Sequence, residues 1–309
     1  MSTREELRFD LVEGEVRHEI VHSDGYLSYA VAECDHTCRG TIVLLHGVGS
    51  NASRWEEFVE QTPLRKEWRI LRMDLRGHGA SESDLKGTLE QHAADIMSVL
   101  DDAGVKEAVL IGHSLGAQIA MTTAVTFPQR VCGLVLLDPL VSDALTSSVQ
   151  AQKRWNWLLY GVEWLARAAN RLGIRRRIPH YSLRQHDRQA RRMLEKGGEE
   201  LKAFIKEYSS PFKDLEHIHT APYVRDLLEV CRHTPDLTKE RMPILVIGAS
   251  SGTFTRASAM KAWVNGLPMG TWCVVRCFHW PLTECPQDVS RIIERWMTSA
   301  FVKPELLDS

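Results

Sequence analysis

The sequence of 309 residues predicts an α/β fold: a mostly parallel sheet of eight strands, with helices on both faces and a helical segment inserted into it. Over the first 140 residues, short apolar runs rich in β-branched residues alternate with helical patterns, which is typical of parallel sheets. From 141 to 236 only helical patterns occur, and strand patterns then resume. We therefore expect a core made of 1–140 and 237–309, and a helical cap made of 141–236.

The elements follow in order along the chain. Ser23-Asp24-Gly25 is a hairpin signal, so the runs on either side of it are expected to pair as strands. The eight expected strands cover 15–22, 26–33, 41–45, 68–73, 108–111, 133–137, 243–247 and 271–275. Helical patterns begin at 52, cover 89–100 and follow Ser114, and a final helical pattern covers 286–300.

Composition excludes several classes of protein. With 44% hydrophobic and 25% charged residues and a net charge of −2, the chain is an ordinary globular protein without a nucleic-acid-binding module, so no nucleic-acid partner is expected. The N-terminus lacks the apolar core of a secretory signal, and no apolar run is long enough to predict a transmembrane segment. Seven scattered cysteines favour a reduced, cytoplasmic setting over a disulfide framework.

One cysteine cluster could contribute to a metal site. Cys34, His36 and Cys38 lie close together, but a structural zinc needs a fourth ligand and no partner motif supplies one. The cluster falls between two strand patterns, so we expect the polar tip of a hairpin. The sequence thus predicts neither a metal nor an organic cofactor.

A nucleophile motif stands between a strand and a helix. Gly112-His113-Ser114-Leu115-Gly116 matches G-x-S-x-G, with an apolar strand pattern before it and a helical pattern after it. The glycines allow a sharp turn that presents the serine, and the start of the following helix favours developing negative charge. Ser114 is therefore the predicted nucleophile.

Two further glycine-rich turns follow strand patterns. His46-Gly47-Val48-Gly49-Ser50 comes after 41–45, and an Asp-x-Arg-Gly-x-Gly-x-Ser turn covers 74–81. Together with the serine motif, these turns resemble the α/β-hydrolase superfamily. The resemblance implies that the backbone N–H groups of Val48 and Leu115 form an oxyanion hole. It also implies a largely architectural role for the 74–81 turn, so His78 is not proposed as a base.

The last motif supplies a histidine. His279 lies between the last strand and the last helix, in a stretch similar to the H-x4-E-x-P ending of the superfamily, and the order of serine before histidine is also the superfamily's. The resemblance implies that His279 is the general base. His113 lies inside the serine turn and is expected to be fixed there. Glu284 is expected to begin the final helix.

The acidic partner of the histidine departs from the superfamily pattern. The position after the 243–247 strand where an Asp is expected holds Ser251, and the stretch 241–283 contains no carboxylate. A hydroxyl cannot stabilise the imidazolium that forms during catalysis. Asp138, at the end of the 133–137 strand, is the predicted substitute, with Asp143 as second candidate. We then expect Ser251 to lie near the imidazole.

These residues predict a serine hydrolase that cleaves a carboxylic ester, thioester or lactone through an acyl-enzyme. One alternative is a non-catalytic ligand-binding or receptor-like protein of the same fold, which the missing late acid favours. The other is an acyltransferase, which differs only in excluding water. The sequence leaves the oligomeric state open.

The predicted cap is strongly basic. Residues 153–196 hold twelve Lys or Arg and three Asp or Glu, a net charge of +9, and four Trp or Tyr side chains between 155 and 164. One interpretation is a cationic rim around a pocket for a hydrophobic acyl substrate with an anionic group. A second is an amphipathic helix in peripheral contact with anionic lipid. The third is a solvated helical surface with its aromatic side chains packed into the core.

Overall fold

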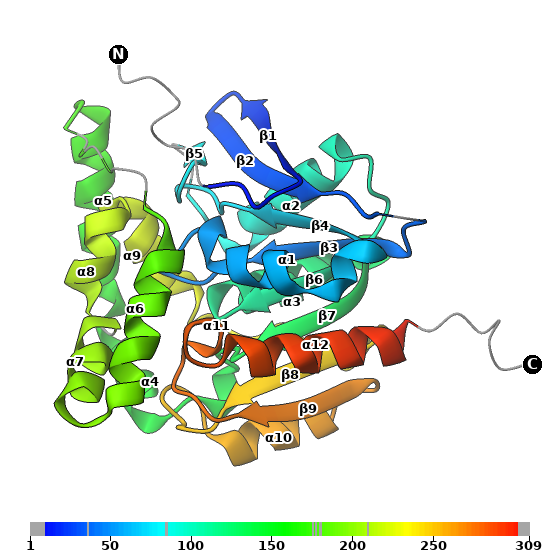
Figure 1. Ribbon diagram of the computed structural model, residues 1–309. Helices are drawn as coiled ribbons and strands as arrows, with labels where there is room; N and C mark the ends of the chain where they lie inside the picture. The colour runs from blue at the N-terminus through cyan, green and yellow to red at the C-terminus, as the bar shows by residue number, and fades with distance from the viewer. Residues whose placement is uncertain are drawn as a thin grey trace, which may run out of the picture.

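The structure is a computed structural model that describes residues 10–35, 37–83, 86–174, 176, 178, 181–208 and 210–301. Figure 1 shows a twisted central sheet with helices in front of it and behind it, and a separate group of helices on its left side. The predicted fold class is confirmed.

The sheet follows the order β1-β2-β4-β3-β6-β7-β8-β9, and all pairs from β4 to β9 along this path are parallel. The first hairpin, β1 with β2, is antiparallel, as is the pairing of β2 with β4. The strands of this path are β1 (Glu15–His22), β2 (Gly25–Ala32), β3 (Gly40–Leu45), β4 (Trp68–Met73), β6 (Ala108–His113), β7 (Val131–Leu137), β8 (Ile244–Ala249) and β9 (Gly270–Val275). A two-residue strand that the sequence did not predict, β5 (Glu82–Ser83), pairs with β2.

Two layers of helices cover the sheet, because some of the helices that connect the strands pack on one face and the others on the opposite face. Each layer closes its own apolar cluster against the sheet, one including Leu100, Ile119 and Met260 and the other including Trp55, Phe58 and Ile293. In Figure 1, α1 and α12 lie in front of the sheet, while α2, α3 and α10 lie behind it. These helices are α1 (Glu56–Gln61), α2 (Leu89–Asp102), α3 (Leu115–Thr126), α10 (Ala257–Asn265) and α12 (Pro286–Ala300).

Between β7 and β8 the chain leaves the sheet and forms a helical insertion, which stands beside the carboxyl ends of the parallel strands (Figure 1). Among the described residues of this stretch no element of the central sheet occurs. The helices of the insertion are α4 (Ser147–Gln152), α5 (Asn156–Arg171), α6 (Leu183–Lys196), α7 (Gly198–Tyr208), α8 (Pro211–His217) and α9 (Thr220–Glu229).

Buried ion pairs attach the insertion to the sheet. His78 Nε2 lies 2.8 Å from an Asp226 carboxylate oxygen of α9, and both side chains are almost fully buried. Arg54, just before α1, pairs with Asp187 of α6, again with both side chains buried. Removing one member of a buried ion pair lowers the free energy of unfolding, so these contacts hold the insertion beside the carboxyl ends of the strands.

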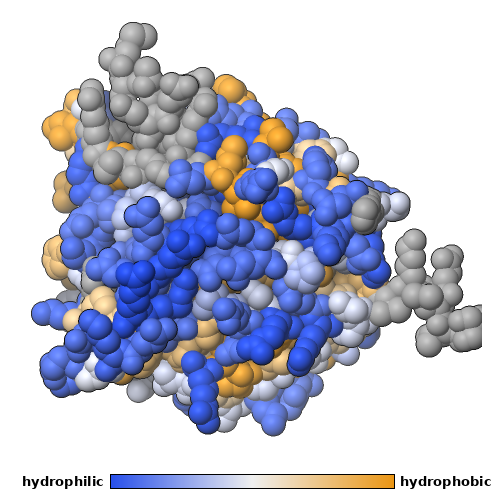
Figure 2. Space-filling view, viewed as in Figure 1, coloured by the Kyte–Doolittle hydropathy of each residue, from blue (hydrophilic) through white to orange (hydrophobic). Residues whose placement is uncertain are grey.

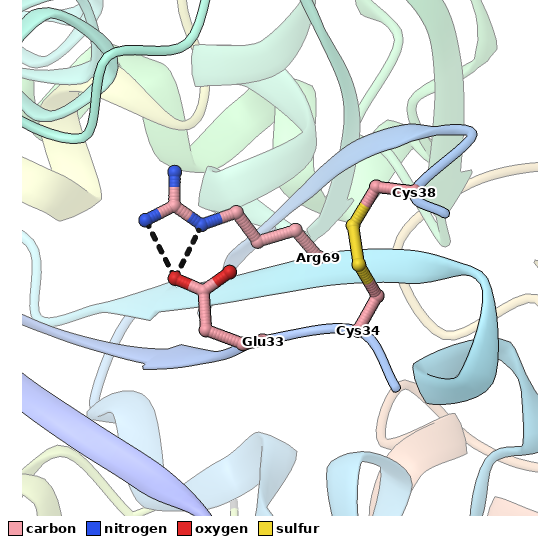
Figure 3. Close-up of a disulfide and its surroundings, with 4 residues drawn as sticks. All are labelled: Glu33, Cys34, Cys38 and Arg69. Atoms are coloured by element: carbon pink, nitrogen blue, oxygen red, sulfur yellow. Dashed lines mark hydrogen bonds and ion pairs between the residues drawn. A yellow bond between two sulfur atoms is a disulfide. The ribbon is translucent and has the colours of Figure 1, made fainter. Parts of the chain in front are cut away.

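A disulfide joins Cys34 and Cys38 in the connection from β2 to β3, where Arg69 of β4 also pairs with Glu33 at 2.8 Å (Figure 3). The expectation of reduced cysteines is therefore wrong for this pair. The expected hairpin is also wrong, because β4 lies between β2 and β3 in the sheet. The connection still brings the Cα atoms of Cys34 and Cys38 within 5.9 Å, a distance that a disulfide spans. His36, the third member of the predicted cluster, lies outside the described residues.

No helix among the described residues is both long enough and apolar enough to cross a lipid bilayer.

Candidate active site

Ser114 lies on the turn between β6 and α3. Its backbone has φ 52° and ψ −110°, a conformation that costs free energy for a residue with a side chain and that often marks functional sites. A Cβ on Gly112 would come within 2.2 Å of the Gly116 carbonyl oxygen, and one on Gly116 within 2.4 Å of the Leu45 oxygen. The two glycines of the motif are therefore required for the strand, the turn and the helix to pack this closely.

The structure brings Ser114, His279 and Asp138 into one row. His279 Nε2 lies 2.9 Å from Ser114 Oγ, and His279 Nδ1 lies 2.6 Å from Asp138 Oδ2. All three residues are buried. Because a carboxylate can only accept, Nδ1 donates to Asp138 and Nε2 is left as the acceptor for the serine hydroxyl. In this tautomer the imidazole can take the serine proton.

Asp138 is held in place from the neighbouring strand. It follows β7 with a positive φ of 41°, and its backbone N–H donates to the Ile247 carbonyl at 2.8 Å. Its Oδ1 accepts the N–H of Ala249 at 3.2 Å, while Oδ2 faces the imidazole. The two carboxylate oxygens thus have different partners, and the orientation of the side chain is fixed.

The loop after β8 contacts the imidazole through a residue other than the expected Ser251. The Ser251 hydroxyl is exposed and hydrogen-bonds the Thr253 hydroxyl at 2.8 Å. The ring of Phe254 packs edge-on against the His279 ring, with centroids 4.5 Å apart. The superfamily pattern places a carboxylate near the imidazole, whereas this loop places the Phe254 ring there.

Two side chains hold the backbone around His279. Glu284 accepts the N–H of Phe278 at 2.9 Å and that of Trp280 at 3.2 Å. His113 Nε2 donates to the carbonyl oxygen of His279 at 2.8 Å, and burial, with the neighbouring His279 ring, lowers the pKa of His113 well below its usual value. His113 is therefore neutral, and it is fixed in the turn, as the sequence predicts.

The expectation for Glu284 is wrong. It ends the short helix α11 (Pro281–Glu284), and the final helix begins at Pro286. Its carboxylate points toward the loop that carries His279, where it accepts hydrogen bonds from the backbone N–H groups of Phe278 and Trp280. The spacing of the H-x4-E-x-P motif was the available signal for this role.

The predicted oxyanion donors belong to two segments that touch. Leu115 is the first residue of α3, and the first N–H groups of a helix have no acceptor within it. A Cβ on Gly47 would come within 3.0 Å of the His113 ring and 3.3 Å of Ser114 Cβ, so the loop that carries Val48 packs directly on the serine turn. Val48 itself lines the pocket above Ser114.

The 74–81 turn lies away from this row. The two carboxylate oxygens of Asp74 accept the N–H groups of Ala52 and Ala80, each at 2.7 Å, and so tie two loops together. His78 of this turn faces Asp226 of the insertion. The turn has the structural contacts that the sequence predicts for it.

A pocket of about 930 Å³ opens over Ser114 and His279, between the sheet and the insertion. Apolar side chains from both parts line it, namely Leu140, Leu159, Val162, Leu227, Val230 and Phe254. This size suits a ligand of drug-like dimensions. Among the described residues no cluster of His, Cys, Asp and Glu could hold a metal ion.

One acidic side chain of the pocket had no signal in the sequence. Asp214 of α8 sits so close to Gly49 that a Cβ there would come within 2.7 Å of its carboxyl group. The Tyr223 hydroxyl donates to Asp214 at 2.8 Å, and burial raises the pKa of this carboxyl to about 6. A carboxyl group whose pKa is raised by burial therefore lies beside the predicted oxyanion loop.

Curated relatives match part of the chain. The chain is 35% identical over 121 residues to the dihydrolipoyllysine-residue acetyltransferase component of an acetoin cleaving system from Cupriavidus necator, which is 37% of this chain and 32% of that protein. It is 34% identical over 107 residues to the sn-1-specific diacylglycerol lipase of Danio rerio, which is 35% of this chain and 33% of the relative. The chain thus spans about a third of the length of these relatives.

Solved structures match nearly the whole chain. A thermophilic esterase from Thermogutta terrifontis superposes with a TM-score of 0.63 at 21% identity, over 93% of this chain and 100% of the esterase. A membrane phospholipase A described as a bacterial virulence factor gives a TM-score of 0.65 at 19% identity, over 93% of this chain and 87% of the phospholipase. The family model described as "Alpha/beta hydrolase family" matches residues 42–292. The chain belongs to the alpha/beta hydrolase family.

Proposed function

We propose that this chain is a serine hydrolase that cleaves a carboxylic ester, or a thioester or lactone, through an acyl-enzyme. The observation that carries the proposal is the buried row from Ser114 Oγ through His279 to Asp138, with spacings of 2.9 and 2.6 Å. A nucleophile, a base and an orienting acid within hydrogen-bond reach are what nucleophilic acyl transfer requires.

The chemistry follows from this geometry. Ser114 Oγ attacks the carbonyl carbon while His279 Nε2 accepts the hydroxyl proton, and Asp138 stabilises the resulting imidazolium. The oxyanion accepts hydrogen bonds from the N–H groups of Val48 and Leu115. His279 then gives its proton to the leaving group as the acyl-enzyme forms, and water activated by the same imidazole releases the acid.

The pocket supports a hydrophobic acyl substrate. Its lining is largely aliphatic and aromatic, and the helical insertion acts in this proposal as a cap that covers the acyl group. Lys153 also lines the pocket and is the cation that would face an anionic group on the substrate, since Lys213 of the same lining pairs with Glu216 at 3.4 Å. Three of the predicted rim cations, Arg167, Arg184 and Arg191, instead pair with carboxylates, so an anionic group is an optional part of the proposal.

The cytoplasmic setting remains a prediction, and the cysteines give evidence both for it and against it. The other described cysteines, Cys132, Cys231, Cys273, Cys277 and Cys285, are free thiols, as expected in a reducing compartment. The Cys34–Cys38 bridge favours an oxidising one.

A panel of p-nitrophenyl esters of increasing chain length tests the proposal. The chain should release p-nitrophenol, and Ser114→Ala should lower kcat by several orders of magnitude, up to about 10⁶-fold. Ser98→Ala, on α2, is a matched control because, among the described residues, its hydroxyl donates to the Ala94 carbonyl of its own helix. Full activity of Ser114→Ala would refute the proposal. Tight ester binding without turnover would favour the receptor-like alternative.

An acyltransferase is the second candidate, favoured by the Cupriavidus necator relative, whose name includes an acetyltransferase component. Adding a primary alcohol to the assay separates the two. A hydrolase forms mainly free acid, whereas an acyltransferase forms mainly the new ester at the same alcohol concentration.

A further inference from the structure

Helix α5 presents its apolar face to solvent. Trp157, Gly161, Trp164 and Leu165 share one side at helical spacing, and Leu172 extends the same stripe just beyond the helix end. Trp157, Trp164 and Leu165 are 64%, 69% and 61% exposed, and Leu172 is 79% exposed. The interpretation of the cap as a solvated surface with its aromatic side chains packed into the core is therefore wrong for this helix. Large exposed apolar stripes of this kind mark interaction surfaces.

The opposite side of α5 is fixed to the protein. Glu163 is buried and accepts from Arg167 at 2.8 Å and from Arg225 of α9, with which it forms a buried ion pair. Leu159 and Val162 line the pocket. Rotating the helix to hide its tryptophans would break the buried pair and open the pocket, so the apolar stripe cannot turn inward at low cost.

Hydrophobic side chains also interrupt the hydrophilic surface along the left margin of the molecule in Figure 2, on the side where the insertion lies in Figure 1. Phe212 of α8, 81% exposed, is another large apolar side chain of the insertion. The stripe on α5 is thus accompanied by further exposed apolar surface on the same part of the fold.

Along the sequence, the charges near the stripe are almost all positive. Between 147 and 184 the sequence has eight Lys or Arg and a single carboxylate, Glu163, which is buried. Arg154 precedes α5 and Arg171 ends it, and both are exposed. A second copy of the chain docking through the same stripe would bring cations against cations. An anionic surface would meet complementary charge at both ends of α5, at Arg154 and Arg171.

We propose that α5 binds an anionic lipid surface, with Trp157 and Trp164 at the level of the headgroups and Arg154 and Arg171 beside lipid phosphates. Tryptophan is enriched at this depth because its ring is apolar and its N–H polar. A helix with an apolar face and flanking cations lies in the plane of such an interface. The proposal concerns binding, and holds whether or not the pocket has esterase activity.

The test is sedimentation of the full chain with lipid vesicles. Binding should occur with mixed phosphatidylcholine and phosphatidylglycerol vesicles and be weak with phosphatidylcholine alone, and added salt should weaken it. The double variant W157S/W164S should lower the vesicle partition coefficient by about tenfold or more. R154E/R171E should lower it by about tenfold or more on the anionic vesicles only.

The matched control is V16S/V21S, which removes two exposed apolar side chains from β1 and should leave binding unchanged. Ser114→Ala should also bind as the unmodified chain does, which separates this test from that of the proposed function. A circular dichroism spectrum and unchanged hydrolysis of a soluble ester show that W157S/W164S is folded.

Each other outcome overturns the proposal. Unchanged binding of W157S/W164S would assign lipid binding to another face, and equal binding to both vesicle types would remove the role of the cations. An absence of binding together with a dimer in light scattering that W157S/W164S dissociates would assign the stripe to a second copy of the chain. An absence of binding by a monomeric chain would leave the stripe without a lipid partner.

Discussion

Replacing Asp138 by Asn changes one atom of the proposed triad and leaves its shape intact. Ala249 N–H donates to Oδ1 of Asp138, so in the variant the amide oxygen is favoured at this position. The amide NH₂ then occupies the Oδ2 position, 2.6 Å from His279 Nδ1. A donor there can bond only an unprotonated Nδ1, which moves the ring proton to Nε2. An imidazole that carries its proton on Nε2 cannot accept the proton of Ser114.

We therefore expect kcat for a p-nitrophenyl ester to fall by roughly 10⁴, the loss known when an orienting aspartate is replaced by asparagine in a serine triad. KM should change little, since Asp138 does not line the pocket among the residues described for it. The assay is steady-state hydrolysis with the chain length that the unmodified protein prefers, and the melting temperature is measured on the same sample.

Asp143→Asn is the matched control, because Asp143 is exposed on the turn just after Asp138 and was the second candidate for the acid. It should retain near-normal kcat. A kcat for Asp138→Asn within tenfold of the unmodified chain, in a folded protein, would refute the role of Asp138 and leave a Ser–His dyad.

Three further predictions concern groups around the site and the fold. Glu284→Gln should lower kcat roughly ten- to hundredfold with little change in KM, because one of the two backbone N–H groups beside His279 loses its acceptor. Asp214→Asn should become more stable relative to the unmodified chain as pH rises from 4 to 7. Burial raises the pKa of Asp214 from 3.8 to about 6, so ionisation destabilises the folded state across this window, by about 3 kcal/mol at most. Urea unfolding of both proteins at each pH measures this difference, and a constant difference contradicts it. Replacing Cys34 and Cys38 by serine should lower the free energy of unfolding by about 2 kcal/mol relative to the unmodified chain in urea unfolding, because the short loop is no longer closed in the unfolded state, and dithiothreitol should abolish this difference.

Most of the sheet was predictable from local pattern. The boundaries of β1, β4 and α12 are those expected, because strand and helix periodicity and their Gly and Pro signals agree there. The two-residue β5 was missed because its pairing with β2 depends on where a distant loop passes.

The site was predictable where residues follow one another on a turn, and less so where the fold brings them together. Asp138 could be suggested only because the usual acid position was empty. Asp214 reaches the pocket from α8 through packing of the insertion, which no motif marks. The Cys34–Cys38 bridge depends on how the turn between β2 and β3 closes, a geometry that spacing alone does not settle.

The exposed apolar stripe of α5 could not be predicted from the sequence either. Periodicity identifies an amphipathic helix, but it does not say which face points inward. Burial of Glu163 with Arg225 reverses the usual orientation, and only the packed structure reveals this.

The central claim, that Ser114 is an activated nucleophile, is tested most directly by labelling with a fluorophosphonate followed by mass spectrometry of the intact chain and its peptides. The account predicts one phosphonyl group per chain, located on the peptide that contains Ser114, and none on Ser114→Ala. Labelling that persists in Ser114→Ala, or a folded chain that the probe does not modify, would contradict it.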